Sequence, residues 1–254
     1  HPPLDIPEPW FSAVKNEDFT LPDNVAKFYS FQSPLQMYNL TGVIGGAYKR
    51  DEWKESWRVY LGLVKLLDDQ VGRLLDELKS EGIYDNSLIM FTSDHGEMLG
   101  SHSLYQKMCM YEESAHVPMY IKFPSSFTPA KKSYDELISL IDIVPTLKDY
   151  YGFESRNGFD GVSLMPLLEA KAASVHDILF MQYDGNGSRS NFQRAILKGN
   201  YKLILDIFKD EFFLELYDVV NDREETENLI FTSDEYDNEV YGMLESLKAF
   251  MKDT

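Results

Sequence analysis

The chain has 254 residues, of which 44% are apolar, so it can bury a sizeable core in one large or two smaller domains. Its 24 basic and 42 acidic residues give a formal charge of −18, which argues against a nucleic acid or an anionic membrane surface as the main partner. The single cysteine excludes an internal disulfide framework, and no apolar run approaches the length needed to span a bilayer.

The N-terminal third of the chain predicts an irregular segment followed by a long helix. Residues 1–50 are rich in Pro, Asn, Gly and aromatic residues and have no sustained period, which is typical of a segment without regular structure. From residue 54 to residue 81, apolar side chains recur at helical spacing, and Gly82 is a suitable helix end. The apolar positions of this amphipathic helix are Trp57, Tyr60, Leu61, Val64, Leu67, Val71, Leu74, Leu75 and Leu78.

Three short apolar runs in the middle of the chain predict β-strands. They lie at residues 87–91, 117–123 and 137–143, and a helix is expected to begin near Pro145 after the third run. Strands that are separated by helices usually pair in parallel. We therefore expect an α/β fold with a mostly parallel sheet flanked by helices.

After about residue 173 the pattern changes to closely spaced strands that form a small antiparallel sheet. Four strands are expected, at residues 178–183, 192–197, 201–205 and 212–217. Gly199 and Asn200 form the turn of a hairpin. A final helix is expected over residues 234–251, with Val240, Met243, Leu244, Leu247 and Phe250 on its inner face. The predicted division is residues 1–173 and a small α+β subdomain, residues 174–254.

The most informative feature is the stretch from Thr92 to Lys107. It begins where the first strand ends, and it contains Asp94, His95, His102 and Lys107. In an open α/β sheet, ligands collect beyond the carboxyl ends of the strands. A carboxylate is a suitable ligand for a hard divalent cation, and an ammonium group stabilises a nearby anion. The stretch therefore predicts a metal and anion site.

Five blocks of sequence, in order, resemble the type I sulfatases, the formylglycine-dependent members of the alkaline-phosphatase superfamily. They are His1-Pro-Pro-Leu with Pro7-Glu-Pro-Trp10; Leu67-Asp-Asp-Gln-Val-Gly-Arg73; the stretch after Thr92 with Tyr111-Glu-Glu-Ser-Ala-His-Val-Pro118; Ile141-Asp-Ile-Val-Pro-Thr146 with Asp160-Gly-Val-Ser163; and Asn200-Tyr-Lys-Leu-Ile204 with Glu215-Leu-Tyr-Asp218 and Asn221-Asp-Arg-Glu224. The blocks cover nearly the whole chain. The resemblance implies an alkaline-phosphatase-like fold.

The nucleophile motif of this family is absent from the sequence. The family carries a Cys/Ser-x-Pro-x-Arg motif whose first residue is oxidised to formylglycine, and no segment of this chain matches it. Cys109 has no following Pro and Arg, so we interpret it as a buried structural thiol. The acidic pair that opens the family's metal site is missing as well. We therefore expect a C-terminal portion of a longer protein, whose upstream part supplies the formylglycine.

The resemblance assigns roles to single residues. Asp94 and His95 correspond to metal ligands; the usual ion is Ca²⁺, with Mg²⁺ or Mn²⁺ as alternatives. Lys107 corresponds to the ammonium that binds the sulfate oxygens, His1 to a proton donor for the ester oxygen, and His102 to a histidine that contacts substrate. The competing interpretations are a surface turn at Asp94 and His95, a solvated side chain at Lys107, an unordered chain end at His1 and a structural role for His102.

The function implied by the resemblance is sulfuric ester hydrolysis, acting on a sulfated carbohydrate or an aryl sulfate. The complete enzyme would carry it out, and the isolated fragment is expected to be inactive. Two alternatives stay open: a phosphonate or phosphate ester hydrolase of the same superfamily, and a non-catalytic binding chain. Because of the −18 charge, a sulfated substrate must be captured by a local cationic pocket. The resemblance also implies a location outside the cytoplasm: periplasmic, secreted or lysosomal.

Overall fold

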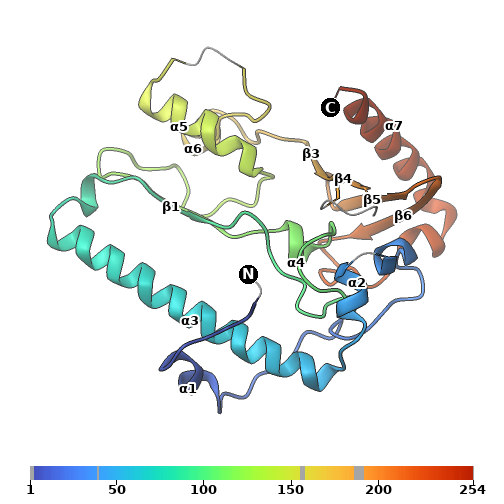
Figure 1. The fold of residues 1–254 in the computed structure, drawn as a ribbon. Coiled ribbons are helices and arrows are strands. Elements are labelled where there is room, and N and C mark those ends of the chain that lie inside the picture. Colours follow the sequence, from blue (N-terminus) through green and yellow to red (C-terminus); the bar gives the residue numbers. More distant parts are fainter. Residues whose placement is uncertain (1–2, 39, 155–157, 186–191, 254) are drawn as a thin grey trace.

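The computed structural model describes residues 3–38, 40–154, 158–185 and 192–253 (Figure 1). The helices are α1 (Trp10–Val14), α2 (Leu40–Gly45), α3 (Arg50–Ser80), α4 (Glu112–Ala115), α5 (Ile143–Tyr151), α6 (Met165–Leu168) and α7 (Asp237–Asp253). The strands are β1 (Ile89–Thr92), β2 (Met119–Lys122), β3 (Ile178–Tyr183), β4 (Phe192–Lys198), β5 (Tyr201–Phe208) and β6 (Glu211–Asp218). No helix of the described ranges is long and apolar enough to cross a membrane.

The C-terminal sheet is an antiparallel meander in the order β3-β4-β5-β6, as the sequence predicted. Gly199, with φ 58°, supports the hairpin turn in which Lys198 pairs with Tyr201. Side chains alternate between the two faces of a strand, so adjacent buried residues enter different cores. Ile196, Leu203 and Leu216 pack under α7, whereas Ala195, Ile204 and Tyr217 pack on the loop of residues 98–111.

Helix α7 covers one face of this sheet (Figure 1). Its inner face was predicted correctly, because Met243 and Leu247 are fully buried and Val240, Leu244 and Phe250 pack against the same core. The opposite face of the sheet packs on the loop that contains Lys107. The small sheet therefore supports the loop that carries the predicted site.

Helix α3 confirms the long amphipathic helix. It begins four residues earlier than predicted and ends at Ser80, where Gly82, with φ 69°, makes the left-handed turn that terminates it. The amide of Gly82 donates to the carbonyl of Lys79 and that of Ile83 to Leu78, at 3.0 Å each. The apolar face is only partly covered, because Val64, Leu67 and Leu74 are about half exposed.

The exposed part of α3 forms one wall of an apolar groove. The other wall is the β1–β2 pair, and the groove has a volume of about 360 Å³. Its lining residues are Val64, Leu67, Asp68, Val71, Leu75, Tyr84, Ile89, Phe91, Tyr120 and Lys122. A groove of this composition is typical of a surface that another segment or partner covers.

The α/β class, the small antiparallel sheet and the C-terminal helix are confirmed, but two details of the predicted central sheet differ. Strands β1 and β2 are present and pair antiparallel, with Ile89 opposite Lys122, so no parallel pair occurs among the described strands. The strand predicted at 137–143 was wrong. Residues Leu140–Asp142 form a short 3-10 helix, because the buried carboxylate of Asp142 accepts hydrogen bonds from the amides of Ser139 and Val162.

Candidate metal and anion site

The predicted site lies in the loop that follows β1. Asp94 and His95 come two and three residues after the strand end, and local hydrogen bonds fix their backbone. The amide of His95 donates to Asp94 Oδ1 at 3.0 Å, and Ser93 Oγ donates to the His95 carbonyl at 2.7 Å. The Asp94 side chain is 86% exposed, and its Oδ2 lies 3.5 Å from His95 Nε2. The two predicted ligands therefore point to the same region.

The orientation of the His95 ring suits metal binding. His95 Nδ1 lies 2.8 Å from the carbonyl of Gly96, so Nδ1 carries the proton in the neutral ring. This hydrogen bond leaves the Nε2 lone pair facing the side on which Asp94 lies. A histidine whose second nitrogen donates to a carbonyl is the usual arrangement of a metal ligand.

The loop and α3 enclose a small pocket of about 190 Å³. It is lined by Tyr60, Ser93, Asp94, His95, Gly96 and Glu97. A pocket of this size holds several water molecules, so it has room for an ion together with a tetrahedral anion. Asp94 and His95, the two predicted metal ligands, therefore both line this pocket.

Three charged side chains influence one another at this pocket. Burial raises the pKa of Glu97, although the amide of Gln106, which donates to its Oε1 at 2.6 Å, and the ammonium of Lys107 lower it. Desolvation opposes ionisation of Asp94, but His95 and Lys107 outweigh it and lower the pKa of Asp94. Lys107 therefore lies near enough to stabilise negative charge at both carboxylates.

A complete metal site needs donors beyond these two. No group of three or more His, Cys, Asp or Glu side chains within the described ranges is arranged to hold a metal ion. Ca²⁺, the hard divalent cation expected here, takes six to eight ligands. Asp94 and His95 would therefore supply only a minority of its coordination sphere. The carboxylate oxygen and the neutral imidazole fit such an ion chemically.

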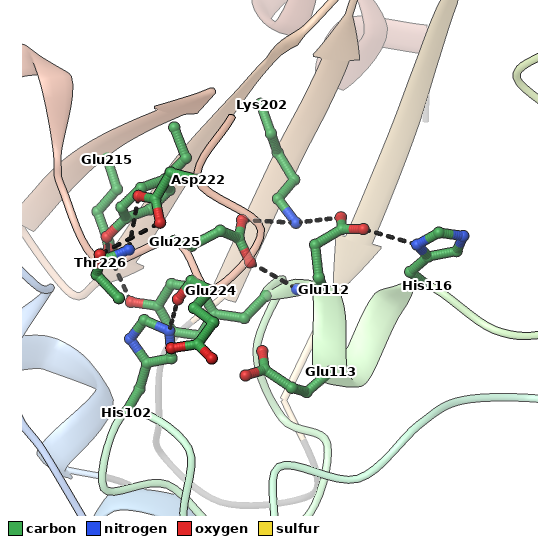
Figure 2. Close-up of polar contacts among 12 residues, drawn as sticks. His102, Glu112, Glu113, His116, Lys202, Glu215, Asp222, Glu224, Glu225 and Thr226 are labelled. Carbon is green, nitrogen blue, oxygen red and sulfur yellow. Dashed lines mark hydrogen bonds and ion pairs between the residues drawn. The ribbon is translucent and has the colours of Figure 1, made fainter. Parts of the chain in front are cut away.

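The other two predicted site residues have different positions. His1 lies outside the described residues. His102 is fully buried, stacks on Tyr111 at 4.0 Å between ring centroids, and has its Nε2 2.8 Å from the carbonyl of Glu224 (Figure 2). The buried ring therefore connects this loop to the segment that follows β6, and its contact with substrate stays a prediction.

His102 gives the fold a dependence on pH. Burial lowers its pKa from 6.5 to about 4, and Nδ1 has no hydrogen-bond partner among the described residues, so the folded protein keeps the ring neutral. The unfolded chain protonates first, so stability present above pH 6.5 falls as the pH drops toward 4, by up to about 1.4 kcal/mol per pH unit. Urea unfolding of wild type and His102→Gln across pH 4–7 measures this loss of stability, and the variant should lack the part of the loss that comes from His102.

The control for this prediction is His116→Gln. The hydrogen bond with Glu112 raises the pKa of His116, so His116 contributes stability that is present at low pH and lost as the pH rises. Below pH 6.5 this contribution is constant, so His116→Gln should lower stability without changing the acid slope, whereas His102→Gln should flatten that slope. An unchanged acid slope in His102→Gln would contradict the assignment.

Cys109 is buried and unpaired, as predicted, and burial raises the pKa of its thiol. Sequence reasoning assigned no role to Glu97, although it lies three residues after Asp94 in the same loop and lines the pocket. It also missed a buried charge cluster of Lys202, Glu112 and Glu225 behind the loop. No local pattern identifies that cluster, because its members are distant in sequence.

The loop itself has an unusual backbone. Five residues have positive φ: Leu99 (44°), Gly100 (92°), His102 (55°), Ser103 (54°) and Gln106 (67°). Non-glycine residues in this region cost free energy and persist where the surrounding structure fixes them, often at functional sites. Here the surroundings are the buried His102 ring and the sheet beneath it.

Comparison with known proteins gives a consistent result. The family model described as sulfatase matches residues 1–153, and the model described as N-sulphoglucosamine sulphohydrolase, C-terminal, matches residues 100–253. An arylsulfatase of Clostridium perfringens is 29% identical over 93% of this chain and 48% of its own length. The chain thus spans about half the length of this relative.

Two solved structures are similar as well. One is a protein in complex with its substrate D-glucosamine-2-N,6-O-disulfate, with 30% identity and a TM-score of 0.67 over 79% of this chain and 41% of that one. The other is the phosphonate monoester hydrolase of Agrobacterium radiobacter, with 25% identity and a TM-score of 0.80 over 100% of this chain and 55% of that one.

Proposed function

Because the chain belongs to the sulfatase family, we propose that it forms part of a sulfuric ester hydrolase site in which Asp94 and His95 bind a divalent metal and Lys107 binds the sulfuryl oxygens. The observation that carries the proposal is the pocket after β1. It is lined by Asp94 and His95, and Lys107 acts electrostatically on the Asp94 carboxylate. A metal ion and an ammonium beside one anion pocket are suited to stabilise charge on a transferring sulfuryl group.

The metal proposed is Ca²⁺, with Mg²⁺ or Mn²⁺ as alternatives. Sulfatases generally use a metal ion and a formylglycine. The Asp94 carboxylate favours a hard cation, whereas the imidazole of His95 slightly favours Mn²⁺. When bound, the ion would supply positive charge at the sulfuryl oxygens, and Asp94 and His95 would hold it at the edge of the pocket.

Lys107 has a second proposed role at the leaving group. As a charged donor that is only partly buried, it can hydrogen-bond the ester oxygen as the bond to sulfur breaks. His1 is proposed as the proton donor to the same oxygen, a role suited to a side chain that titrates near neutrality. His102 holds the loop that carries Lys107, and its buried position supports a structural role.

An upstream part of the same protein is proposed to supply the formylglycine and to cover the apolar groove between α3 and β1–β2. Val64 and Leu67 are about half exposed there and Tyr120 is 68% exposed. Covering such a surface would remove apolar area from water and give the site its remaining ligands. Residues 1–173 would then belong to the catalytic domain, and residues 174–254 would form a subdomain that supports it.

The proposed substrate is a sulfated carbohydrate, with an aryl sulfate as the second choice. The similar protein in complex with a disulfated glucosamine supports the first, and the arylsulfatase of Clostridium perfringens supports the second. The similarity to a phosphonate monoester hydrolase keeps phosphonate esters as the alternative reaction.

The test is a product assay on the protein isolated from its source, after its intact mass and N-terminal sequence have been determined. Release of sulfate from glucosamine 6-sulfate or from an aryl sulfate, abolished by Asp94→Asn, would support the proposal. Hydrolysis of a phenylphosphonate ester alone would favour the alternative reaction. A protein that starts at His1, has no companion chain and releases no sulfate would refute catalysis.

A further inference from the structure

A fully buried lysine lies on β5, behind the loop that carries the proposed site. The side chain of Lys202 is 0% exposed, and its Nζ lies 2.7 Å from Glu225 Oε1 and 2.8 Å from Glu112 Oε1 (Figure 2). Lys202 is on the same face of β5 as Ile204, which packs against the loop core. A buried ammonium is costly unless carboxylates pair with it, so the position of each partner is tightly specified.

Glu225 joins this lysine to the backbone of α4. It is 0% exposed, and its Oε2 accepts a hydrogen bond from the amide of Glu112 at 2.6 Å (Figure 2). Its backbone has φ 51°, and its amide donates to the carbonyl of Asp222 at 3.1 Å. A non-glycine residue in the left-handed region has to be stabilised by its surroundings. Here the turn directs the carboxylate at both Lys202 and the first turn of α4.

Glu112 completes the connection on the other side. Its Oε1 binds Lys202, and its Oε2 lies 2.8 Å from His116 Nδ1. Both carboxylate oxygens of Glu112 are therefore occupied. Burial opposes its ionisation, but the hydrogen bond from His116 and the charge of Lys202 outweigh this and lower the pKa of Glu112 to about 2. Glu112 is thus a carboxylate anion that attracts Lys202 at neutral pH.

Two of the four residues of α4, Glu113 and Ser114, are hydrogen-bonded directly to the segments of the proposed site. The carbonyl of Ser114 accepts from the amide of Gly96, and the carbonyl of Glu113 accepts from the amide of Glu97, each at 2.8 Å. Ser114 Oγ donates to the carbonyl of Lys107, also at 2.8 Å. A displacement of α4 would therefore shift both the segment after Asp94 and His95 and the backbone of Lys107.

We propose that Lys202 and Glu225 are positioning residues of the sulfatase site: they hold α4 against the C-terminal sheet, and α4 holds the segments that carry Asp94, His95 and Lys107. The inference rests on the proposed function, because it takes the pocket beside Asp94 and His95 to be part of a sulfatase site. It assigns a task to the C-terminal sheet, which contributes no group to the pocket itself. Neither residue touches the pocket, so both act through α4.

The first test is amide hydrogen exchange on the full chain, measured by NMR. In Lys202→Met, Glu112 and Glu225 lose the ammonium that links them, and burial, which raises the pKa of Glu225 to about 8 even beside Lys202, keeps the Glu225 carboxyl protonated, so α4 should loosen. We expect the amides of Gly96 and Glu97 to exchange at least about tenfold faster, since local opening exposes the groups it frees. The strand amides of β4 and β6 should keep their protection.

Two further variants keep this test decisive. Lys198→Met is the matched control, because Lys198 lies on the neighbouring β4 and its ion pair with Glu239 is exposed; it should leave Gly96 and Glu97 unchanged. Glu112→Gln is used if Lys202→Met does not fold, because the Glu112 side chain is 23% exposed and its loss should be tolerated. The same two amides should respond, more weakly.

The outcomes separate positioning from ordinary stability. Faster exchange confined to Gly96 and Glu97 supports the proposal, whereas an equal rise across β4 and β6 shows a general stabilising role and overturns it. Unchanged exchange at both amides in both variants also overturns it. Because exchange needs no turnover, the local effect in this chain, combined with no sulfate release by the complete protein isolated from its source, would refute the proposed function and leave the positioning intact.

Discussion

In the complete enzyme, Lys107→Met should lower kcat/KM for sulfate ester hydrolysis about 100- to 1000-fold, the loss typical of removing one donor that stabilises a transition-state anion. The physical reason is the removal of the cation that lowers the pKa of both Asp94 and Glu97 and would face the sulfuryl oxygens. Initial rates with an aryl sulfate measure the loss.

Lys132→Met is the control for Lys107→Met, because Lys132 is exposed on a loop away from the pocket. It should keep wild-type activity. A Lys107→Met variant that retains activity within about threefold would identify Lys107 as a solvated lysine instead. The full chain offers a second readout: without the Lys107 charge, the pKa of Asp94 should rise in an NMR titration, whether or not the chain turns over substrate.

The sequence predicted best those elements whose signal is local and periodic. Helix α3 follows from apolar residues at helical spacing before Gly82, and the β3–β6 meander follows from short strands with a glycine turn at Gly199. For the C-terminal helix α7, the apolar spacing that predicts the helix also predicts which side chains it buries. The inner face of α7 was correct to the residue for this reason.

The failures occur where a single buried side chain overrides the local pattern. Residues 137–143 have the composition of a strand, but the carboxylate of Asp142 binds two backbone amides and His176, which fixes a 3-10 turn instead. The face of α3 was predicted from its periodicity, but its exposure at Val64 and Leu67 depends on what lies across the groove. Neither effect can be read from neighbouring residues.

The same distinction between local and distant sequence signals applies to the residues of the site. Asp94, His95 and Lys107 were predicted together as site residues because they are close in sequence and follow a strand end. Lys202 and Glu225 were missed because their partners lie up to 113 residues away along the chain. Asp94 and His95 line the pocket and Lys107 acts on Asp94 from outside that lining, whereas the residues that the sequence missed hold α4 beside it.

The packing of α4 on the loop after Asp94 leads to a second large effect, on stability. A Cβ at Gly96 would lie 2.0 Å from the carbonyl oxygen of Glu113, so Gly96→Ala forces α4 away. The clash is with backbone, which cannot rotate aside. It also disrupts the hydrogen bonds from the amides of Gly96 and Glu97 to α4. Overpacking costs about 1–3 kcal/mol and each lost hydrogen bond about 1 kcal/mol, so we expect about 3–5 kcal/mol of lost stability in urea unfolding.

Gly72→Ala is the matched control for Gly96→Ala. Gly72 lies inside α3, and a Cβ there would meet no atom within 4 Å, so alanine should stabilise the chain by about 0.5–1 kcal/mol through its higher helix propensity. The same substitution should therefore have opposite signs at the two glycines. A loss below about 1 kcal/mol at Gly96 would show that α4 yields easily. It would then be too soft to transmit the position of Lys202 to Asp94, because a contact that moves at little cost cannot hold a metal ligand in place.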